Sequence, residues 1–341
     1  MKDVRESSVI TDYKPDPENI LEVRNLKKYF TVQASFFGKP LAFLKAVDDV
    51  SLTVGRGKTM GIVGESGCGK TTMGRTVLRL YDVTDGEIYF DGRNISREKR
   101  ARLRDIRKDM QIIFQDPYSS LSPRLPISEI IAEGVRIHKI VPKNEIKDYV
   151  IGVMKKCGLP SHYYSRYPFE FSGGQRQRIC IARALAVQPR FVVCDEPVSA
   201  LDVSIQAQII NLLKDLQRDL NLTYLFISHD LSVVEHISDT IGVMYLGSLV
   251  ESGDKSGIFG NPMHPYTQAL FSAVPIPDPK TKMKRIILAG DIPSPVNPPS
   301  GCKFHTRCPH CTDICKDVAP KFSECEPGHH VACHLYTGCR P

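Results

Sequence analysis

A glycine-rich segment carries the residue types that can bind a chain of phosphates. GESGCGKT at 64–71 fits the pattern G-x-x-x-x-G-K-[ST] and lies between the apolar run TMGIV and a helical pattern. Its glycines let backbone N–H groups turn toward an anion, and the following helix adds the positive end of its dipole. We expect Lys70 to reach the β and γ phosphates of ATP, Thr71 to ligate Mg²⁺, and Cys68 to be structural. The predicted binding residues are Gly64, Ser66, Gly67, Cys68, Gly69, Lys70, Thr71 and Thr72.

Two adjacent carboxylates follow a second apolar run and supply the other half of this chemistry. Asp195 and Glu196 come directly after FVVC, so a strand would carry both acids to the phosphate end of a sheet. Asp195 can hold Mg²⁺ through water, whereas Glu196 can polarise the attacking water as a general base. Without a glycine-rich segment elsewhere in the chain, an Asp-Glu pair after a strand more often marks the start of a helix. Together with the glycine-rich segment, it predicts hydrolysis of ATP.

Both segments need a sheet whose strands end at one edge, and the sequence pattern provides such strands. Alternating apolar residues in ILEVRNL and AVDDVSLTV predict two strands, and TMGIV precedes the glycine-rich turn and a helix. Further apolar runs, separated by helical patterns, predict buried strands at 111–114, 191–194, 224–228 and 241–246. The predicted fold class is α/β with a mostly parallel sheet.

Composition divides the chain into three parts. Residues 1–19, with two prolines and little apolar pattern, are expected to form a flexible leader. Residues 20–270 hold the nucleotide-binding domain, and apolar residues at helical spacing predict an inserted helical subdomain over about 117–174. Residues 271–341 contain 11 of the 24 prolines and seven of the 11 cysteines, which predicts a separate, loop-rich and cysteine-rich appendix.

The overall composition excludes some classes of protein. Of the 341 residues, 42% are hydrophobic and 24% charged, and no run approaches the roughly 18 apolar residues of a membrane-spanning helix. The N-terminal stretch lacks the pattern of a secretory signal, so we expect the chain to stay in the cytoplasm. The basic residues behind the net charge of +7 are interleaved with acidic ones, which predicts a solvated surface and no nucleic-acid partner.

Four further motifs carry a resemblance to a known family. FSGGQRQR at 171–178 resembles the signature sequence of the ABC ATPases. Gln115 in IFQDP resembles the Q-loop of that family, SALD at 199–202 its D-loop, and His229 in ISHD its switch histidine. The resemblance implies a P-loop NTPase fold of the ABC type. It implies Glu196, His229 and Gln115 as catalytic residues, and Thr71, Gln115 and Asp195 as the residues around Mg²⁺.

The signature segment predicts a site that serves a second chain. It opens a helix with a hydroxyl and bare backbone amides, which form an anion site that cannot reach the glycine-rich loop of its own chain. The resemblance implies a head-to-tail dimer, in which each ATP lies between the loop of one subunit and the signature of the other. We expect the partner to be a homologous ATPase, in a heterodimer rather than a homodimer. The residues implied at this interface are Ser172, Gly173, Gly174, Gln175 and Asp202.

Three aromatic residues bear on the match to the family pattern. Phe171 stands where the signature commonly begins with Leu, a change of packing that is not expected to remove activity. Tyr29 and Phe30 lie where the family stacks an aromatic ring on adenine. The alignment favours Phe30, and both residues stay open for this role.

Two other segments indicate a branch of the family. FQDPYSSLSPR at 114–124 and HPYTQALFSAVP at 264–275 resemble the ATPases of importers for dipeptides, oligopeptides and nickel. The resemblance implies two membrane permeases as partners, a substrate-binding protein outside the membrane, and a location at the cytoplasmic face of the cell membrane. Peptides are the first expectation for the cargo, with nickel or oligosaccharides as alternatives. A soluble ABC ATPase acting on nucleic acid or ribosomes would need a coiled coil or a second nucleotide domain, which this sequence does not show.

The cysteine-rich end shares the resemblance through GCKFHTRCPH at 301–310. The family motif implies a [4Fe–4S] cluster on Cys302, Cys308, Cys315 and Cys333. Their spacing, C-x5-C-x6-C-x17-C, matches neither common ferredoxin pattern, so this prediction rests mainly on the resemblance. Zinc is the alternative, because CPHC at 308–311 is a C-x2-C pair. Its further ligands would come from His330, Cys333 and His334, and the cysteines left spare by either metal are Cys311, Cys325 and Cys339. Either metal would mainly staple the appendix.

Overall fold

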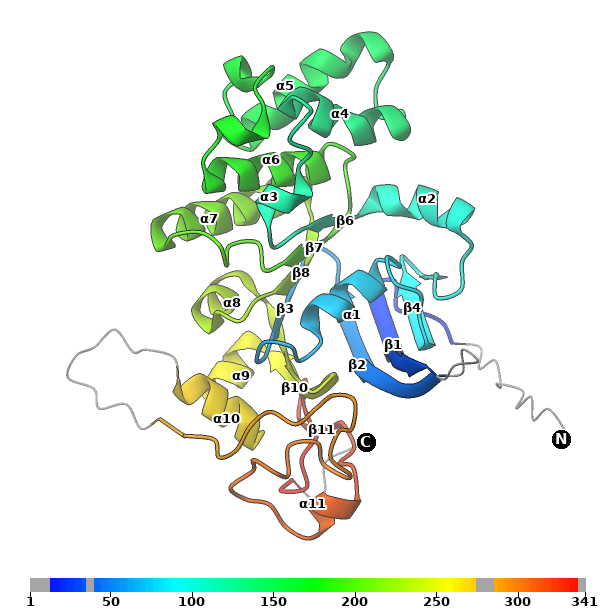
Figure 1. Cartoon of the computed structure of the whole chain (residues 1–341), viewed down its shortest axis with the longest axis vertical. Helices are drawn as coiled ribbons and strands as arrows, with labels where there is room; N and C mark the ends of the chain where they lie inside the picture. The colour runs from blue at the N-terminus through cyan, green and yellow to red at the C-terminus, as the bar shows by residue number, and fades with distance from the viewer. Residues whose placement is uncertain (1–12, 35–39, 274–284, 337–341) are drawn as a thin grey trace, which may run out of the picture.

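An eight-stranded sheet runs through the centre of the molecule (Figure 1). The computed structural model describes residues 13–34, 40–273 and 285–336. The strand order is β11-β12-β10-β9-β3-β8-β7-β6. The strands are β3 (Thr59–Val63), β6 (Met110–Ile113), β7 (Phe191–Asp195), β8 (Thr223–Ile227), β9 (Thr240–Tyr245), β10 (Ser248–Asp254), β11 (Ser323–Glu326) and β12 (His329–Val331).

The five strands from β9 to β6 are parallel, whereas β10, β12 and β11 pair antiparallel. Both faces of the parallel strands are covered, which explains their short, continuously apolar runs. In β7, for example, Val193 faces one hydrophobic cluster while its neighbours Val192 and Cys194 face the other. The predicted α/β fold with a mostly parallel sheet is therefore confirmed, and the strands predicted in this sheet lie within one or two residues of their observed positions.

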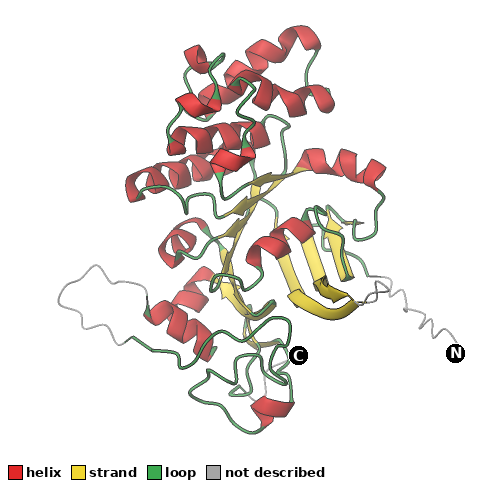
Figure 2. Ribbon diagram, viewed as in Figure 1, coloured by secondary structure: helices red, strands yellow, loops and turns green. Residues whose placement is uncertain are grey.

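A second, antiparallel sheet packs beside the first, with helix α1 (Lys70–Val77) between the two (Figure 2). Its strand order is β2-β1-β4-β5. The strands are β1 (Asn19–Ala34), β2 (Pro40–Gly55), β4 (Asp85–Phe90) and β5 (Arg93–Asn94). Helix α1 can lie between the sheets because Met73 and Val77 are fully buried in their shared core.

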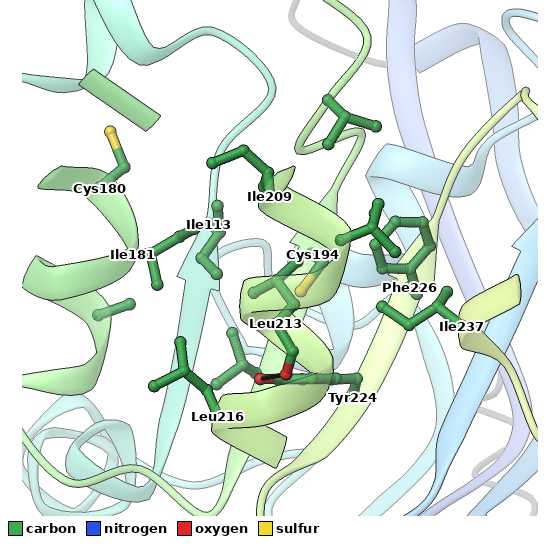
Figure 3. Packing of buried hydrophobic residues seen from close by; sticks show 14 of the residues in the cluster. Ile113, Cys180, Ile181, Cys194, Ile209, Leu213, Leu216, Tyr224, Phe226 and Ile237 are labelled. Atoms are coloured by element: carbon green, nitrogen blue, oxygen red, sulfur yellow. Dashed lines mark hydrogen bonds between the residues drawn. The ribbon is translucent and has the colours of Figure 1, made fainter. Parts of the chain in front are cut away.

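Helices α6 (Gly173–Leu185), α7 (Val203–Leu220) and α8 (Leu231–Ile237) cover the opposite face of the parallel strands. Apolar residues of α7 recur at helical spacing and pack on the buried face of β8, as Figure 3 shows. The hydroxyl of Tyr224 donates a hydrogen bond to the Leu213 carbonyl at 3.0 Å, so its one polar atom is satisfied inside the core. This packing fixes the ends of β7 and β8, where the predicted acids and histidine lie.

A group of helices projects from the sheet at the upper end of the molecule (Figure 1). No residue of 117–174, all of which the structure describes, belongs to a strand, and the bounds of the helical subdomain stay a prediction. Its α-helices are α3 (Pro117–Ser120), α4 (Ile127–Ile137) and α5 (Ile146–Lys156), with 3₁₀ turns at Lys143–Glu145, Ser161–Tyr163 and Pro168–Glu170. Helix α2 (Arg100–Asp109) leads from the antiparallel sheet to β6.

The C-terminal part extends the main sheet. Strand β12 pairs with β10, and β11 pairs with β12, so the predicted appendix adds a hairpin to the edge of the nucleotide-binding domain. The helices near this hairpin are short: α9 (Lys255–Gly260) and α10 (Pro265–Ser272) follow β10, and α11 (Ile314–Asp317) precedes β11. Among the helices that the structure describes, none is both long and apolar enough to span a membrane.

The described part of the predicted leader contacts β1. The guanidinium of Arg24 lies 3.8 Å from the ring centre of Tyr13, and the Tyr13 hydroxyl donates a hydrogen bond to Glu22. The backbone N–H of Asp16 donates to the same carboxylate at 2.8 Å. Residues 13–18 therefore pack on the antiparallel sheet, whereas residues 1–12 of the predicted leader lie outside the described residues.

Candidate functional site

The glycine-rich segment turns from the end of β3 into the first turn of α1. Gly64 and Gly69 have φ angles of 149° and 105°, in the region that favours glycine. A Cβ atom on Gly64 would lie 2.3 Å from the Met244 carbonyl oxygen, and one on Gly69 would lie 2.0 Å from that of Ala46. The loop therefore needs glycine for both its backbone conformation and its close contacts.

Lys70 lies inside this loop. Its side chain is buried, and Nζ donates hydrogen bonds to the carbonyl oxygens of Gly64 at 2.8 Å and Glu65 at 3.0 Å. The ammonium group thus stands where a phosphate chain would enter the loop. Cys68 is also buried, and burial raises the pKa of its thiol while nearby Lys70 opposes the shift. A buried, protonated thiol fits the structural role expected for Cys68.

The loop and the predicted acidic strand end meet. The Thr71 hydroxyl donates a hydrogen bond to Asp195 Oδ1 at 2.7 Å, and the Arg75 guanidinium lies 3.4 Å from Oδ2. Burial raises the pKa of Asp195, while Thr71 and Arg75 oppose that shift. A hydroxyl and a carboxylate are hard oxygen donors that suit Mg²⁺, which keeps several waters and takes phosphate oxygens as further ligands.

Glu196 lies next to two of the predicted catalytic partners. Its backbone has a φ of 47°, and its N–H donates to the Ile227 carbonyl at 3.0 Å, which holds it at the ends of β7 and β8. Gln115 Nε2 donates to Glu196 Oε2 at 2.8 Å, and His229 Nδ1 lies 3.4 Å from the same oxygen. The structure therefore brings Gln115, Glu196 and His229 together, although they are far apart in the sequence.

These groups border one cavity of about 490 Å³. Nucleotide-binding and catalytic residues from the prediction line it, namely Ser66, Gly67, Gly69, Lys70, Thr71, Thr72, Gln115, Glu196 and His229. The sequence analysis missed the remaining lining residues, which are Leu44, Lys45, Ala46, Gly247 and Pro295. These belong to β2, to the turn between β9 and β10, and to a C-terminal loop, where no motif or charge pattern marked them.

The two candidate adenine-stacking rings, of Tyr29 and Phe30, contact residues outside the cavity lining. The Tyr29 hydroxyl donates a hydrogen bond to Asp48, and the Phe30 ring packs edge-on against Tyr81 with centroids 5.4 Å apart. Neither ring, although both belong to the described residues, is among those that line the cavity. The assignment of adenine stacking to Phe30 or Tyr29 stays a prediction.

The signature segment, at the start of α6, is separate from the lining of this cavity. Ser172 is exposed and caps α6, with its hydroxyl accepting from the Gln175 N–H at 3.4 Å and its own N–H donating to Gln175 Oε1 at 3.1 Å. A Cβ atom on Gly174 would lie 2.5 Å from Ile205 Cγ2, so this glycine packs on α7, whose first turn Asp202 caps. Residues 172–175, which the structure describes, are absent from the cavity lining.

The four cysteines of the predicted cluster lie near one another. Burial, with smaller contributions from the nearby Cys315, Cys333 and Cys308, raises the pKa of Cys302 to about 11. Within the described residues, however, no group of three or more histidines, cysteines, aspartates or glutamates is placed to hold a metal ion. The conformation described thus does not present a formed ligand set for either iron–sulfur or zinc.

The other residues of the zinc alternative have different contacts. The His330 ring stacks on Phe322 with centroids 5.6 Å apart, and His334 Nε2 lies 2.8 Å from the Val318 carbonyl oxygen. Of the cysteines predicted to be spare, Cys311 is a free thiol, Cys325 is disulfide-bonded, and Cys339 lies outside the described residues.

Comparison with known families finds two matches along the chain. Residues 47–199 match the family described as ABC transporter, and residues 250–315 match the oligopeptide/dipeptide transporter C-terminal region. The oligopeptide transport ATP-binding protein AppF of Bacillus subtilis is 53% identical, over 94% of this chain and 98% of its own length. A putative peptide import ATP-binding protein of Brucella ovis is 52% identical, over 92% of this chain and 97% of its own length.

Solved structures agree with these matches. The cbiO1 subunit of Clostridium perfringens, part of the ABC transporter complex cbiONQ, aligns with a TM-score of 0.62 and 25% identity, covering 72% of this chain and 92% of its own. The ATP-binding cassette MJ0796, a dimer in a post-hydrolysis state with ADP and Pi, aligns with a TM-score of 0.61 and 26% identity, covering 69% and 98%. With the cavity, these similarities establish that the chain belongs to the ABC transporter family, as an ATP-hydrolysing subunit with the C-terminal region of its oligopeptide/dipeptide branch.

Proposed function

We propose that this chain is the ATP-hydrolysing motor of an importer of dipeptides or oligopeptides, bound at the cytoplasmic face of the cell membrane to two permease subunits. The observation that carries the proposal is the joining of an intact nucleotide cavity to a C-terminal region that matches oligopeptide/dipeptide transporters. The two relatives from Bacillus subtilis and Brucella ovis are named as oligopeptide transport and putative peptide import ATP-binding proteins. A motor for nickel or oligosaccharides would have the same cavity, because the permeases and the binding protein select the cargo.

The phosphate-binding loop binds the nucleotide, and the residues around Glu196 activate the attacking water. Lys70 leaves the carbonyl oxygens of Gly64 and Glu65 and offers its ammonium to the phosphates. Mg²⁺, when bound, offsets the negative charge that develops on those phosphates. Glu196 accepts the proton of the attacking water, while Gln115 and His229 orient its carboxylate. His229 also donates a hydrogen bond to the γ phosphate.

A second ATPase subunit completes the site. The outward position of Ser172 and the lack of signature residues in the cavity lining support this arrangement. A helix N-terminus with free N–H groups is an anion site, so the signature of one subunit can bind the phosphates held by another. The partner is a homologous ATPase rather than an identical chain, so that this chain's Lys70, Glu196 and His229 work with another protein's signature.

The proposal predicts that the isolated chain binds ATP but hydrolyses it slowly, and that a partner raises its turnover. The partner ATPase and the permeases would be identified by co-purification from membranes, followed by measurement of ATP hydrolysis with and without the partner. Ser172→Arg places a bulky cation at the signature, so it should lower turnover of the mixture and leave ATP binding to this chain unchanged. Full activity of the monomer at low concentration would overturn the shared site.

The four cysteines Cys302, Cys308, Cys315 and Cys333 are proposed to hold a [4Fe–4S] cluster with a structural role. Their mutual effect on the pKa of Cys302 supports proximity, although the described thiols must shift to form a ligand set. Protein purified without oxygen should be brown, with about four irons and four sulfides per chain. Cys308→Ser should lose the colour, and Cys311→Ser should keep it. A colourless protein with one zinc per chain would contradict the cluster.

A further inference from the structure

A pair of charged residues joins the C-terminal region directly to the phosphate-binding loop. Arg307 Nη1 donates to Glu65 Oε2 at 2.9 Å, and Arg307 Nη2 donates to Glu65 Oε1 at 3.2 Å. The two residues are 242 positions apart in the sequence. Glu65 is the second residue of the loop, so this two-pronged contact holds the loop from outside the nucleotide-binding motifs.

The contact is well shielded from solvent. The side chain of Arg307 is 8% exposed and that of Glu65 is 26% exposed. The hydrogen bonds to Glu65 raise the pKa of Arg307, against the effect of burial, so the guanidinium stays charged. Removing Glu65 would leave the buried cation of Arg307 without compensation, and that makes the pair sensitive to substitution.

Glu65 in turn contacts Lys70, the residue expected to bind the phosphates. Its carbonyl oxygen accepts a hydrogen bond from Lys70 Nζ at 3.0 Å. Its backbone N–H donates to the Tyr266 hydroxyl at 2.8 Å, so a second residue from beyond the motifs also fixes it. The carboxylate, the N–H and the carbonyl of Glu65 are therefore all engaged, and only the last of these bonds must break when Lys70 turns to a phosphate.

The segment that carries Arg307 is anchored firmly enough to hold the loop. Phe304 is buried, with its ring centroid 5.2 Å from that of Tyr245 and 5.5 Å from that of Tyr266. Lys303 Nζ donates to Asp48 Oδ2 at 2.8 Å and to Ser248 Oγ at 2.7 Å. Arg307 thus extends from a segment that is fixed to the core and to the antiparallel sheet.

A second contact brings the C-terminal region to the same cavity. The backbone N–H of Lys45 donates to the Pro295 carbonyl at 3.2 Å, and both residues line the cavity. The C-terminal region therefore reaches the nucleotide site at two places, the wall at Pro295 and the loop at Glu65.

We infer that Arg307 is a positioning residue for ATP binding and hydrolysis: it holds Glu65 so that the phosphate-binding loop keeps its shape when Lys70 leaves the Glu65 carbonyl. The C-terminal region, which matches oligopeptide/dipeptide transporters, then also contributes to nucleotide binding. The inference depends on nucleotide binding by this chain and is independent of the transported substrate.

The test compares full-length variants by the dissociation constant for ATP, by KM and kcat, and by the thermal unfolding midpoint. Arg307→Ala should weaken ATP binding and raise KM by about tenfold, with kcat changed by less than about threefold. Arg307→Lys keeps the charge and loses the two-pronged geometry, so its affinity should lie between those of the parent and Arg307→Ala. Lys316→Ala is the matched control, because it removes an exposed cation paired with Asp313 in the same region. It should bind ATP like the parent.

A double-mutant cycle separates positioning from a general loss of structure. If Arg307 acts through Glu65, the double variant Glu65→Ala/Arg307→Ala should bind ATP no more weakly than the weaker single variant. Additive losses, or ATP affinity unchanged in a folded Arg307→Ala, would overturn the inference. If Arg307→Ala does not fold, Glu65→Gln takes its place, because it removes the charge and keeps the size. A several-fold weaker affinity then supports positioning, and unchanged affinity refutes it.

Discussion

Glu196→Gln is expected to lower the rate of ATP hydrolysis by about 10²- to 10⁴-fold, the usual contribution of a general base, while ATP still binds. Glutamine keeps the size of the side chain, and its amide oxygen can still accept the hydrogen bond that Gln115 donates to Glu196 at 2.8 Å. It cannot take the proton of the attacking water. The effect should therefore fall on kcat and leave the dissociation constant for ATP within about threefold of the parent.

Single-turnover hydrolysis and ATP titration of the same preparation would measure the two effects separately. Glu235→Gln is the control, because it removes a carboxylate of equal size from an exposed position on α8. It should hydrolyse ATP at the parent rate. Unchanged hydrolysis in Glu196→Gln would remove Glu196 from the mechanism.

The parts of the fold that could be predicted are those with a strong local pattern. TMGIV, FVVC and YLFIS are continuous apolar runs because both faces of their sheet are covered, and all three form strands. The phosphate-binding role of GESGCGKT could be predicted because the whole motif lies within eight residues. The structure explains two of its glycines, which have no room for a Cβ atom. The meeting of Thr71 with Asp195 also followed, because parallel strands bring their ends to one edge of the sheet.

The aromatic positions near the start could not be resolved from spacing. Strand β1 pairs with β2 through several register shifts, among them one between Lys28 and Tyr29. A shift of one residue turns a side chain to the other face of the sheet, so alignment alone cannot say which ring would stack on adenine. Leu44 and Ala46, from the facing strand β2, line the cavity, and neither has a side chain that suggests chemistry.

The contacts of the C-terminal region could not be predicted from the sequence for a different reason. SECE and HHV are short and polar, so nothing in their pattern indicated strands that extend the main sheet. The contact between Arg307 and Glu65 joins two loops, and loops have no periodicity from which a distant neighbour can be inferred. The expectation of a separate appendix missed this docking, because Phe304, its most buried ring, packs into the core of the main domain.

Lys70→Ala is expected to weaken ATP binding by roughly 10- to 100-fold, as for the loss of a hydrogen bond to a charged group, and to abolish measurable hydrolysis at ordinary ATP concentrations. Nζ is a buried cation in the loop, and without it the loop would offer the phosphates no positive side chain. The change should also destabilise the nucleotide-free protein by about 1–3 kcal/mol, because the carbonyls of Gly64 and Glu65 lose their shared donor.

Calorimetric titration with ATP and chemical unfolding without nucleotide would check both effects of Lys70→Ala. Lys58→Ala is the control, because Lys58 is an exposed lysine whose Nζ lies 3.5 Å from Asp239, and neither effect should follow its removal. Lys70→Ala differs from Glu196→Gln in kind: the first loses binding and turnover together, whereas the second keeps binding. Parent-like ATP affinity in Lys70→Ala would mean that the loop binds phosphate through its backbone alone, and the role given to the buried ammonium would then be wrong.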